Sequence, residues 1–358
     1  MAGVKRISAD VIRRQLEAVF RTWGMAEDHI ATTVKVMVAT DLSGVDSHGL
    51  GMLPSYADRR RRGIMNMQPD LKIVREKPAV ALIDADRSIG HPPSVMAMKL
   101  AVDKARVCGV AAVGVRNSNH FGAAGYYSRM AAEMGMVGMA MTNAPGAAMV
   151  PTFGREAMLG TNPIAFAAPA TKNPSFSLDM ATTTVAFGKL TISKRLGKAI
   201  PEGWALDEGS KSTTNADIAH AARRQLPLGG DRERGGHKGY GLGTMVEILC
   251  AVLTGAWADG FDDQGRPKHT DYDVGHFFFA IDPGLVRADG EFEGDMDLMM
   301  DMLRATPPAD PSKPVMVAGD PEVKETAERK RLGIPVADML IEETRAVTEE
   351  CGAEFLLA

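Results

Sequence analysis

Apolar residues recur at helical spacing along much of the chain, and short apolar runs bounded by turn residues lie between these stretches. The spacing predicts helices over residues 8–23, 27–42, 53–62, 94–108, 123–134, 240–255, 295–305 and 336–353. The short runs predict two strands within 71–84 and further strands at 110–115, 137–142, 164–168, 176–179, 276–281 and 315–317. This order of elements indicates a mixed α/β (α+β) protein.

Four stretches give sharper expectations. Residues 91–93 (His-Pro-Pro) predict a break before the next helix, because proline lacks a backbone N–H. The polar stretch 200–236 predicts a loop. The apolar stretch 240–255 carries Glu247 at its centre, so it predicts a buried helix rather than a membrane span. On the helix at 295–305, the spacing predicts that four apolar side chains face inward: Met296, Leu298, Met299 and Met302.

Composition narrows the class of protein. The chain has 358 residues, of which 45% are hydrophobic and 24% charged, which is typical of globular proteins with about two domains. The 41 Lys and Arg against 45 Asp and Glu give a net charge of −4, which predicts neither a nucleic-acid nor a membrane partner. The three cysteines lack metal-site spacing, and the first residues are too polar for a signal peptide. We therefore expect a cytoplasmic protein.

The common motifs of nucleotide and hydrolase chemistry are absent from the sequence. There is no GxGxxG, no P-loop, no GxSxG and no HExxH. The nearest match is the stretch 239–243 (Gly-Tyr-Gly-Leu-Gly), which lacks the third glycine and has no strand before it. The standard dinucleotide-binding fingerprint is therefore absent.

His48 follows Ser47 in a polar loop and precedes a glycine. Histidine titrates near neutral pH, so it can donate or accept a proton, and Ser47 could hydrogen-bond a substrate oxygen. The alternative is a solvent-exposed histidine in an ordinary turn. His120 lies between a predicted strand and a predicted helix, where the helix N-terminus favours a bound negative charge. Its alternative is a capping loop.

Two further segments could bind a ligand. His237 and Lys238 lie among glycines just before a helix, which predicts an anion site or simply a glycine-rich helix start. Asp179 ends a short strand and could orient a histidine, bind ribose hydroxyls or cap a helix. No His, Asp or Glu cluster has ligand spacing, so we predict no metal site.

Six segments together resemble the malate/L-lactate dehydrogenase family of the second type, which includes sulfolactate and ureidoglycolate dehydrogenases. Each segment alone is weakly specific, but all six occur in the family's order and span most of the chain. They are residues 41–49 (DLSGVDSHG), 119–126 (NHFGAAGY), 159–163 (LGTNP), 178–182 (LDMAT), 235–242 (GGHKGYGL) and 319–322 (GDPE).

The resemblance implies a fold outside the Rossmann class, with a mixed sheet, flanking helices and a helical lobe. We expect that lobe to comprise residues 1–80 with 310–358, and the NAD(P)-binding domain to comprise residues 81–309. The resemblance favours NAD(H) over NADP(H), a small carboxylate substrate and a homodimer.

The resemblance also implies roles for single residues. His48 matches the family's proton donor, His120 matches a second histidine assigned as acid/base in some members, and Asp179 would hold a histidine or the cofactor. The cofactor-binding positions implied are Thr142, Asn162, Asp179, Met180, Ala181, His237, Lys238, Gly319, Asp320 and Pro321.

One substitution departs from the family pattern. Ser47, Met52 and Tyr56 fall on its substrate-binding segment, but many members carry an arginine for the substrate carboxylate where Met52 stands. This variant resembles the branch called hydroxycarboxylate dehydrogenase B. Loss of an arginine–carboxylate pair changes the pocket, so Lys238 or a nearby arginine must replace it, or the substrate differs.

The sequence thus predicts hydride transfer between NAD(P)H and a 2-oxo acid or 2-hydroxy acid, with a histidine moving the proton. Two alternatives stay open at this point. One is a reductase for cyclic imino acids in the same fold, and the other is a nucleotide-binding protein without turnover.

Overall fold

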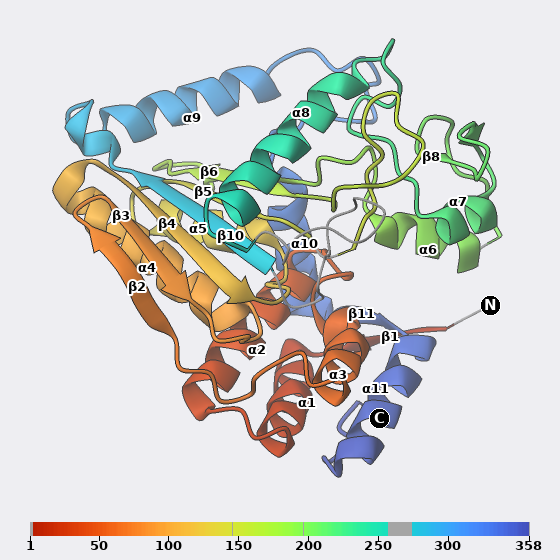
Figure 1. The fold of residues 1–358 in the computed structure, drawn as a ribbon. Helices are drawn as coiled ribbons and strands as arrows, with labels where there is room; N and C mark the ends of the chain where they lie inside the picture. Colours follow the sequence, from red (N-terminus) through yellow and green to blue (C-terminus); the bar gives the residue numbers. More distant parts are fainter. Residues whose placement is uncertain (1–2, 145, 196, 257–273, 358) are drawn as a thin grey trace.

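The computed structural model describes residues 3–144, 146–195, 197–256 and 274–357, and a seven-stranded mixed sheet lies at its centre (Figure 1). The strand order is β2-β3-β4-β10-β5-β6-β7, and all neighbours are antiparallel except β3 and β4. The strands are β2 (Lys72–Lys77), β3 (Val80–Asp84), β4 (Val110–Ser118), β5 (Val137–Thr142), β6 (Ile164–Ala168), β7 (Phe176–Met180) and β10 (Val274–Ile281).

Helices α4 (His91–Cys108) and α5 (Ala124–Glu133) cover one face of this sheet. Their buried side chains meet strand residues such as Val113 and Phe278 in one core. The β3–α4–β4 connection joins the parallel pair, which needs a crossover element of this length. Helix α8 (Gly236–Glu247) and the π-helical turn η2 (Ile248–Val252) lie on the opposite face.

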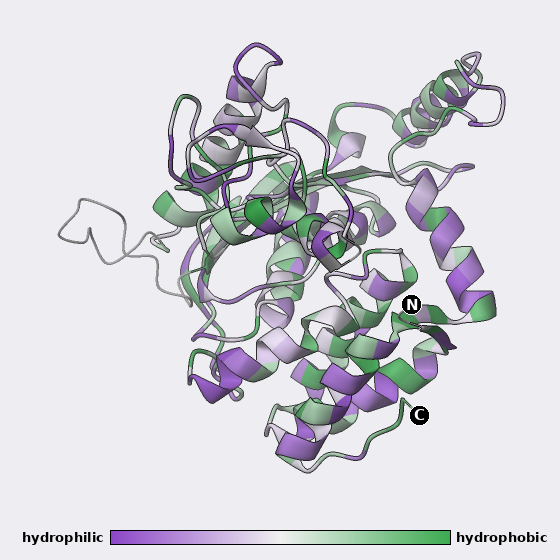
Figure 2. Cartoon of the chain, turned by 90° about the vertical axis from the view of Figure 1, so that its right-hand side faces the viewer, coloured by the Kyte–Doolittle hydropathy of each residue, from purple (hydrophilic) through white to green (hydrophobic). Residues whose placement is uncertain are grey.

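The two ends of the described chain meet in a separate helical layer. Strand β1 (Val4–Ile7) pairs with β11 (Ile334–Ala337), and one apolar core joins residues 7–89 with residues 334–357. Hydrophilic and hydrophobic residues alternate along these helices, as expected for helices with one buried side (Figure 2). The helices are α1 (Ala9–Thr22), α2 (Glu27–Leu42), α3 (Leu53–Arg61) and α11 (Asp338–Cys351), and the 3₁₀ turn η1 (Leu50–Met52) precedes α3.

The split of the chain into two domains stays a prediction. Strand β2 begins before residue 81 and yet forms the edge of the large sheet. The remaining elements are α6 (Phe187–Arg195), α9 (Glu291–Arg304), α10 (Asp320–Leu332) and the 3₁₀ turn η3 (Pro283–Leu285).

Three predictions of secondary structure were wrong. Residues 91–93 are the first turn of α4, where proline is tolerated because these N–H groups have no helical partner. The stretch 200–236 contains β8 (Ala205–Leu206), β9 (Ser212–Thr213) and α7 (Ala216–Ala222), and Asn215 caps that helix. Residues 315–317 form no strand, and the N–H of Val317 bonds to the Asp320 carboxylate instead.

Two predictions of burial were wrong in part. They concern the helix over 240–255 and the inward side chains of the helix over 295–305. Only one side of α8 and η2 contacts the sheet, so Ile248 is 51% exposed and Leu253, just after η2, is 64% exposed. On α9, three of the side chains predicted to face inward are exposed, namely Leu298, Met299 and Met302, whereas Asp297 and Met300 are the buried residues. The outer surface above the sheet is therefore rich in apolar side chains.

Candidate active site

The loop that carries His48 connects α2 to η1. Asp41, near the end of α2, holds the far end of this loop. The buried Asp41 carboxylate accepts a hydrogen bond from the N–H of Leu50 at 2.8 Å. A Cβ on Gly49 would lie 1.9 Å from the same carboxylate, so only glycine fits after His48. Burial raises the pKa of Asp41 to about 8.

Arg329 on α10 holds this loop from the other side. Its guanidinium, which is 7% exposed, donates a hydrogen bond to the Asp41 carbonyl at 2.8 Å and forms an ion pair with Asp46. Its Nε also donates to Glu325, one turn earlier on the helix, at 2.8 Å. The position of the His48 loop therefore depends on a helix about 280 residues further along the chain.

The fold brings His48 and His120 together. Their ring centroids lie 5.3 Å apart with a 30° tilt, and Ser47 Oγ lies 2.8 Å from His48 Nδ1. The buried Tyr56 hydroxyl lies 2.8 Å from His120 Nδ1. Two histidines and the tyrosine predicted from separate segments thus form one cluster.

The neighbours of His120 define which nitrogen carries its proton. The N–H of Gly122 donates to His120 Nδ1 at 3.3 Å, so Nδ1 is an acceptor and the neutral ring carries its hydrogen on Nε2. Gly122 has φ +79°, and a Cβ there would lie 2.9 Å from Nε2 of the buried His91. A glycine is needed at this position on both counts.

Both histidines are held in their neutral form. The surrounding protein lowers the pKa of His48 to about 4, because an imidazolium would lose hydration there. Burial, together with the neighbouring His48 and His91, lowers the pKa of His120 well below its ordinary value. At neutral pH the pair can therefore accept a proton without first releasing one.

His48 faces a cavity of about 380 Å³. Ser47, Asp179, Met180 and Ala181 also line it, so the 47–48 segment and the 179–181 segment meet as the sequence predicted. Asp179 borders this cavity and is exposed there, and the surrounding protein raises its pKa to about 6. Its carboxylate accepts a hydrogen bond from the N–H of Gly125, at the start of α5, at 2.7 Å.

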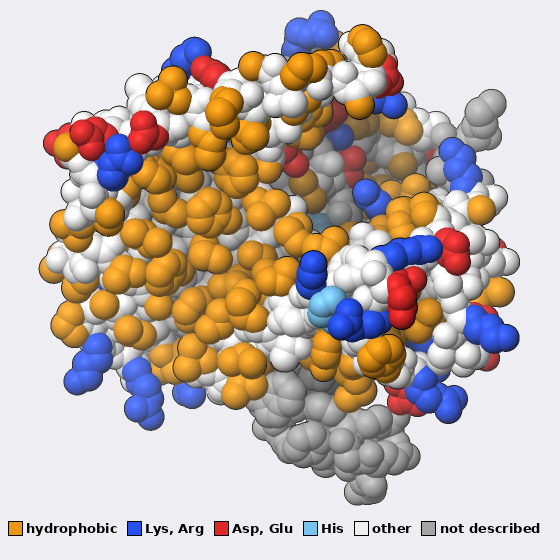
Figure 3. Space-filling model, turned by 90° about the horizontal axis from the view of Figure 1, so that it is seen from above, with side chains coloured by type: hydrophobic (Ala, Val, Ile, Leu, Met, Phe, Trp, Pro, Cys, Tyr) orange, Lys and Arg blue, Asp and Glu red, His pale blue; other side chains and the backbone are white. Residues whose placement is uncertain are grey.

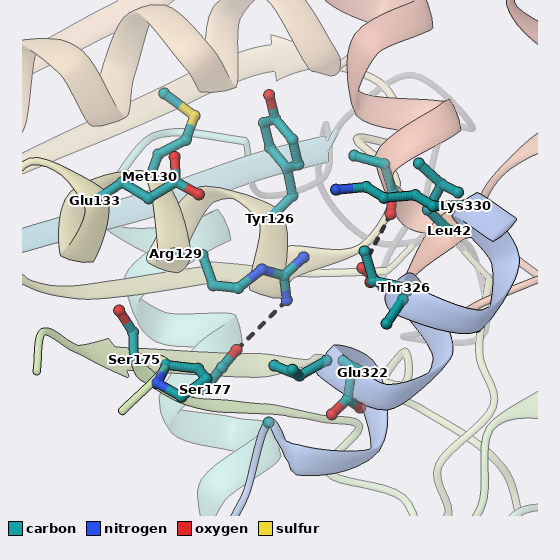
Figure 4. Close-up of a pocket in the computed structure, with 16 residues that line it drawn as sticks. Leu42, Tyr126, Arg129, Met130, Glu133, Ser175, Ser177, Glu322, Thr326 and Lys330 are labelled. Carbon is teal, nitrogen blue, oxygen red and sulfur yellow. Dashed lines mark hydrogen bonds between the residues drawn. The ribbon is translucent and has the colours of Figure 1, made fainter. Parts of the chain in front are cut away.

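A larger cavity of about 640 Å³ continues from the first one (Figure 4). The two cavities share four lining residues: Ser43, Arg129, Ser177 and Glu322. Arg129 points toward Ser177 across the cavity, and Nη1 lies 3.4 Å from the Ser177 oxygen. Both volumes fall in the range of ligand pockets, and the two adjoining cavities offer room for a ligand that extends from one into the other.

Of the segment 319–321, Gly319 lines the larger cavity. Its φ is +104°, and a Cβ there would lie 3.3 Å from the Ser177 backbone. The Asp320 carboxylate is already paired with Arg304 at 2.7 Å, and Pro321 begins α10. In this structure Gly319 is thus the member of the segment that meets the cavity.

Thr142 and Asn162 are buried and satisfied inside the protein. Thr142 Oγ1 lies 2.7 Å from His276 Nδ1. The Asn162 amide donates to Glu247 at 2.7 Å, and its oxygen accepts from the N–H of Ala144 at 3.1 Å. Thr142 ends β5 and Asn162 lies just before β6. The predicted cofactor contacts of these two side chains stay predictions.

Three other predicted residues lie apart from the cavity that holds His48. His237 lies half-exposed at the start of α8, with Nδ1 3.1 Å from Arg232, and Lys238 beside it is exposed. Met52 packs against the core of the helical layer rather than lining the cavity.

The sequence reasoning missed several residues that build the site: Arg129, Lys189, Glu322 and Arg329. Glu322 follows the 319–321 segment directly, and this adjacency was the one available signal. The other three lie on the helices α5, α6 and α10, where a single charged residue in the sequence usually indicates no more than a solvent-exposed position. Within the described residues, no three His, Cys, Asp or Glu side chains are grouped to bind a metal, and no helix has the length and hydrophobicity to span a membrane.

Comparison with known proteins identifies the family. The family model for malate/L-lactate dehydrogenase matches residues 7–345. The chain belongs to this family. It is 38% identical to a malate dehydrogenase of Pyrococcus abyssi, over 98% of this chain and 96% of that protein. It is also 38% identical to an L-sulfolactate dehydrogenase of Methanocaldococcus jannaschii, over 93% and 94%.

The structure agrees with this assignment. A crystal structure of malate dehydrogenase from Entamoeba histolytica superposes with a TM-score of 0.90 at 29% identity, covering 98% of this chain and 99% of that one. The predicted fold class, outside the Rossmann class, is confirmed. The chain is an oxidoreductase of the 2-hydroxy acid dehydrogenase type, and the cyclic imino acid reductase alternative is a weaker fit.

Proposed function

We propose that this enzyme interconverts a 2-oxo acid and a 2-hydroxy acid, with His48 as the group that moves the proton. The observation that supports this most is His48 at the wall of a cavity lined by residues 179–181, with the His120 ring packed 5.3 Å behind it. A neutral His48 accepts the hydroxyl proton during oxidation and returns it during reduction. Ser47, at 2.8 Å from its Nδ1, orients the ring.

His120 is the second member of the pair. Its Nδ1 is engaged by Gly122 and Tyr56, so Nε2–H is the free donor of its neutral ring. A fixed donor polarises a carbonyl oxygen without carrying a full charge. We assign His120 this role beside His48.

The nicotinamide cofactor supplies the hydride when bound. The residues that would hold it are Asp179, Met180 and Ala181 in one cavity and Gly319 in the other. Because Glu322 borders both cavities, its carboxylate opposes an additional phosphate, and we propose NAD(H) rather than NADP(H).

We further propose that the enzyme is a homodimer joined through the apolar face above the sheet (Figure 3). Exposed apolar side chains follow each other along α8, η2 and α9. A hollow of about 530 Å³ lies beside η2, lined by apolar residues such as Leu82 and Leu253 and by the charged residues 75–77. A monomer rarely exposes so continuous an apolar surface, and a second copy would cover it by two-fold symmetry. Sedimentation at low protein concentration tests this. A cytoplasmic location stays a prediction.

One assay tests the reaction. Oxidation of NADH and of NADPH is followed with oxaloacetate, pyruvate, sulfopyruvate and Δ1-piperideine-2-carboxylate as substrates. Turnover of a 2-oxo acid with NADH is expected. Turnover of the cyclic imine alone would overturn the proposed substrate class. Binding of NADH without any turnover would instead support the alternative of a nucleotide-binding protein.

A further inference from the structure

A 2-oxo acid brings a carboxylate next to the carbon that reacts, and the cavity must bind that charge. The segment 47–56 has no arginine for it, and Met52 packs into the helical core. The described cations that line the cavity with His48 are Arg129 and Lys189. This inference rests on the proposed function and asks which of the two binds the substrate.

Arg129 already has an anionic neighbour. A Cβ on Gly125 would lie 3.1 Å from Arg129 Nη1 and 2.8 Å from Asp179 Oδ2, so the two side chains flank the same point. The positive charge of Arg129 lowers the pKa of Asp179, against the larger effect of burial, which raises it. Arg129 therefore compensates Asp179 rather than offering a free charge to a second carboxylate.

Lys189 lines the same cavity as His48. It is in the first turn of α6, and a Cβ added to the preceding Gly188 would lie 3.5 Å from Ser47 Cβ. The start of α6 therefore lies within one side-chain atom's reach of the residue that precedes His48. The Lys189 side chain is exposed, and the structure gives its ammonium group no ion pair with any described residue.

The start of α6 adds to this charge. Ala186, Gly188, Lys189 and Ile192 all border the cavity, so the helix presents its N-terminal end there. Backbone N–H groups at a helix N-terminus favour a bound anion. The lysine and the helix end thus act in the same direction, a few residues from His48.

We propose that Lys189 binds the substrate carboxylate and takes the place of the arginine missing at position 52. Lysine is a compact point charge, whereas arginine binds a carboxylate with two parallel hydrogen bonds. The site therefore selects for negative charge and accepts varied geometry, which suits a dehydrogenase for several 2-oxo acids.

The test measures binding as well as turnover. The variants are Lys189→Met, Lys189→Arg as the charge-conserving rescue, and Lys194→Met as the matched control on the exposed side of the same helix. Oxamate, an unreactive 2-oxo acid analogue, is titrated into each protein with NADH bound. Lys189→Met is expected to weaken oxamate binding by on the order of 10–100-fold, with NADH affinity and melting temperature unchanged.

Lys189→Arg should keep oxamate binding within a few-fold of wild type, and Lys194→Met should not change it. The KM for a turned-over 2-oxo acid should rise in Lys189→Met much more than kcat falls. Equal oxamate affinity in wild type and Lys189→Met would overturn the assignment, and so would absence of oxamate binding to wild type. Oxamate binding without turnover of any 2-oxo acid would instead contradict the proposed reaction and leave the carboxylate site standing.

Discussion

Two loops of this enzyme carry a histidine between polar and glycine residues, and the fold treats them differently. His48 is enclosed by its own loop, by His120 and by a helix from near the C-terminus. His237 begins α8 half-exposed, and its ring contacts Arg232. The two local sequences are similar in kind, but His48 is packed against the rest of the protein, which lowers its pKa to about 4.

The difference shows that a histidine flanked by glycines is only a candidate acid or base. The packing around the ring decides its pKa and therefore which proton it can move. The position of the His48 loop depends on elements that are distant in sequence, notably α10 through Arg329, which bonds to Asp41 and Asp46. A loop exposed to water cannot shift a pKa in this way. The following experiments test whether the two loops differ in function as they do in structure.

Replacing the paired histidines should have the largest effect. His48→Ala and His120→Ala are each expected to lower kcat by about 10²–10⁴-fold, the usual contribution of a positioned acid or base. Steady-state kinetics with a saturating 2-oxo acid measure this. If both variants keep near-normal kcat, the pair is not the acid/base and the comparison fails.

The pH dependence should reveal the low pKa of His48. Reduction needs the imidazolium, which is abundant only below about pH 4, so kcat/KM for reduction should fall about tenfold per pH unit above that value. Oxidation needs the neutral ring, so its kcat/KM should stay level from mildly acidic to neutral pH. A bend in either profile near about pH 6.5 would mean an unshifted histidine instead.

Replacing Arg329, which holds the His48 loop through Asp41 and Asp46 and is called the clamp below, should have the next largest effect. Arg329→Met leaves the buried Asp41 carbonyl without its donor and should cost about 1–3 kcal/mol in the free energy of unfolding. The loop would then shift, and a displacement of about 1 Å can lower kcat on the order of 10²-fold. Urea unfolding and kinetics measure the two effects. Lys324→Met, on the exposed side of α10, is the control, and equal behaviour of both variants would refute the clamp.

Tyr56→Phe should have a moderate effect on His120. The hydroxyl contributes one hydrogen bond to Nδ1, so kcat is expected to fall by up to about tenfold. Tyr127→Phe removes an equally buried hydroxyl that donates to the Phe121 carbonyl, and it should lower stability while sparing kcat. Equal kinetic losses in the two variants would show a general effect of packing.

The smallest effect is expected at the exposed loop. His237→Gln should leave kcat within about threefold and change the KM for NADH by only a few-fold, because an exposed hydrogen bond contributes little. A loss of kcat as large as that of His48→Ala would remove the distinction between the loops.

Much of this site followed from the sequence. The segments at 47–48, 56, 120 and 179–181 were identified, and the helices α1, α2 and α3 follow the apolar spacing closely. Arg329 could not be found in this way, because its partners Asp41 and Asp46 are distant in sequence. Lys189 could not be found either, because a single charge on a helix has no local signature. The outward apolar side of α9 was also misjudged, since spacing shows that a helix has an apolar side but not what covers it.

The pairing of β1 with β11 has a consequence for synthesis of the protein. Val4 pairs with Ala337, and Arg329 reaches back to the loop of His48. Strand β1 therefore has no partner until β11 has been synthesised, and the His48 loop is held in place only once α10 has been made. A chain truncated before α10 would carry His48 without the contacts that position its loop, so such a truncated chain should be inactive.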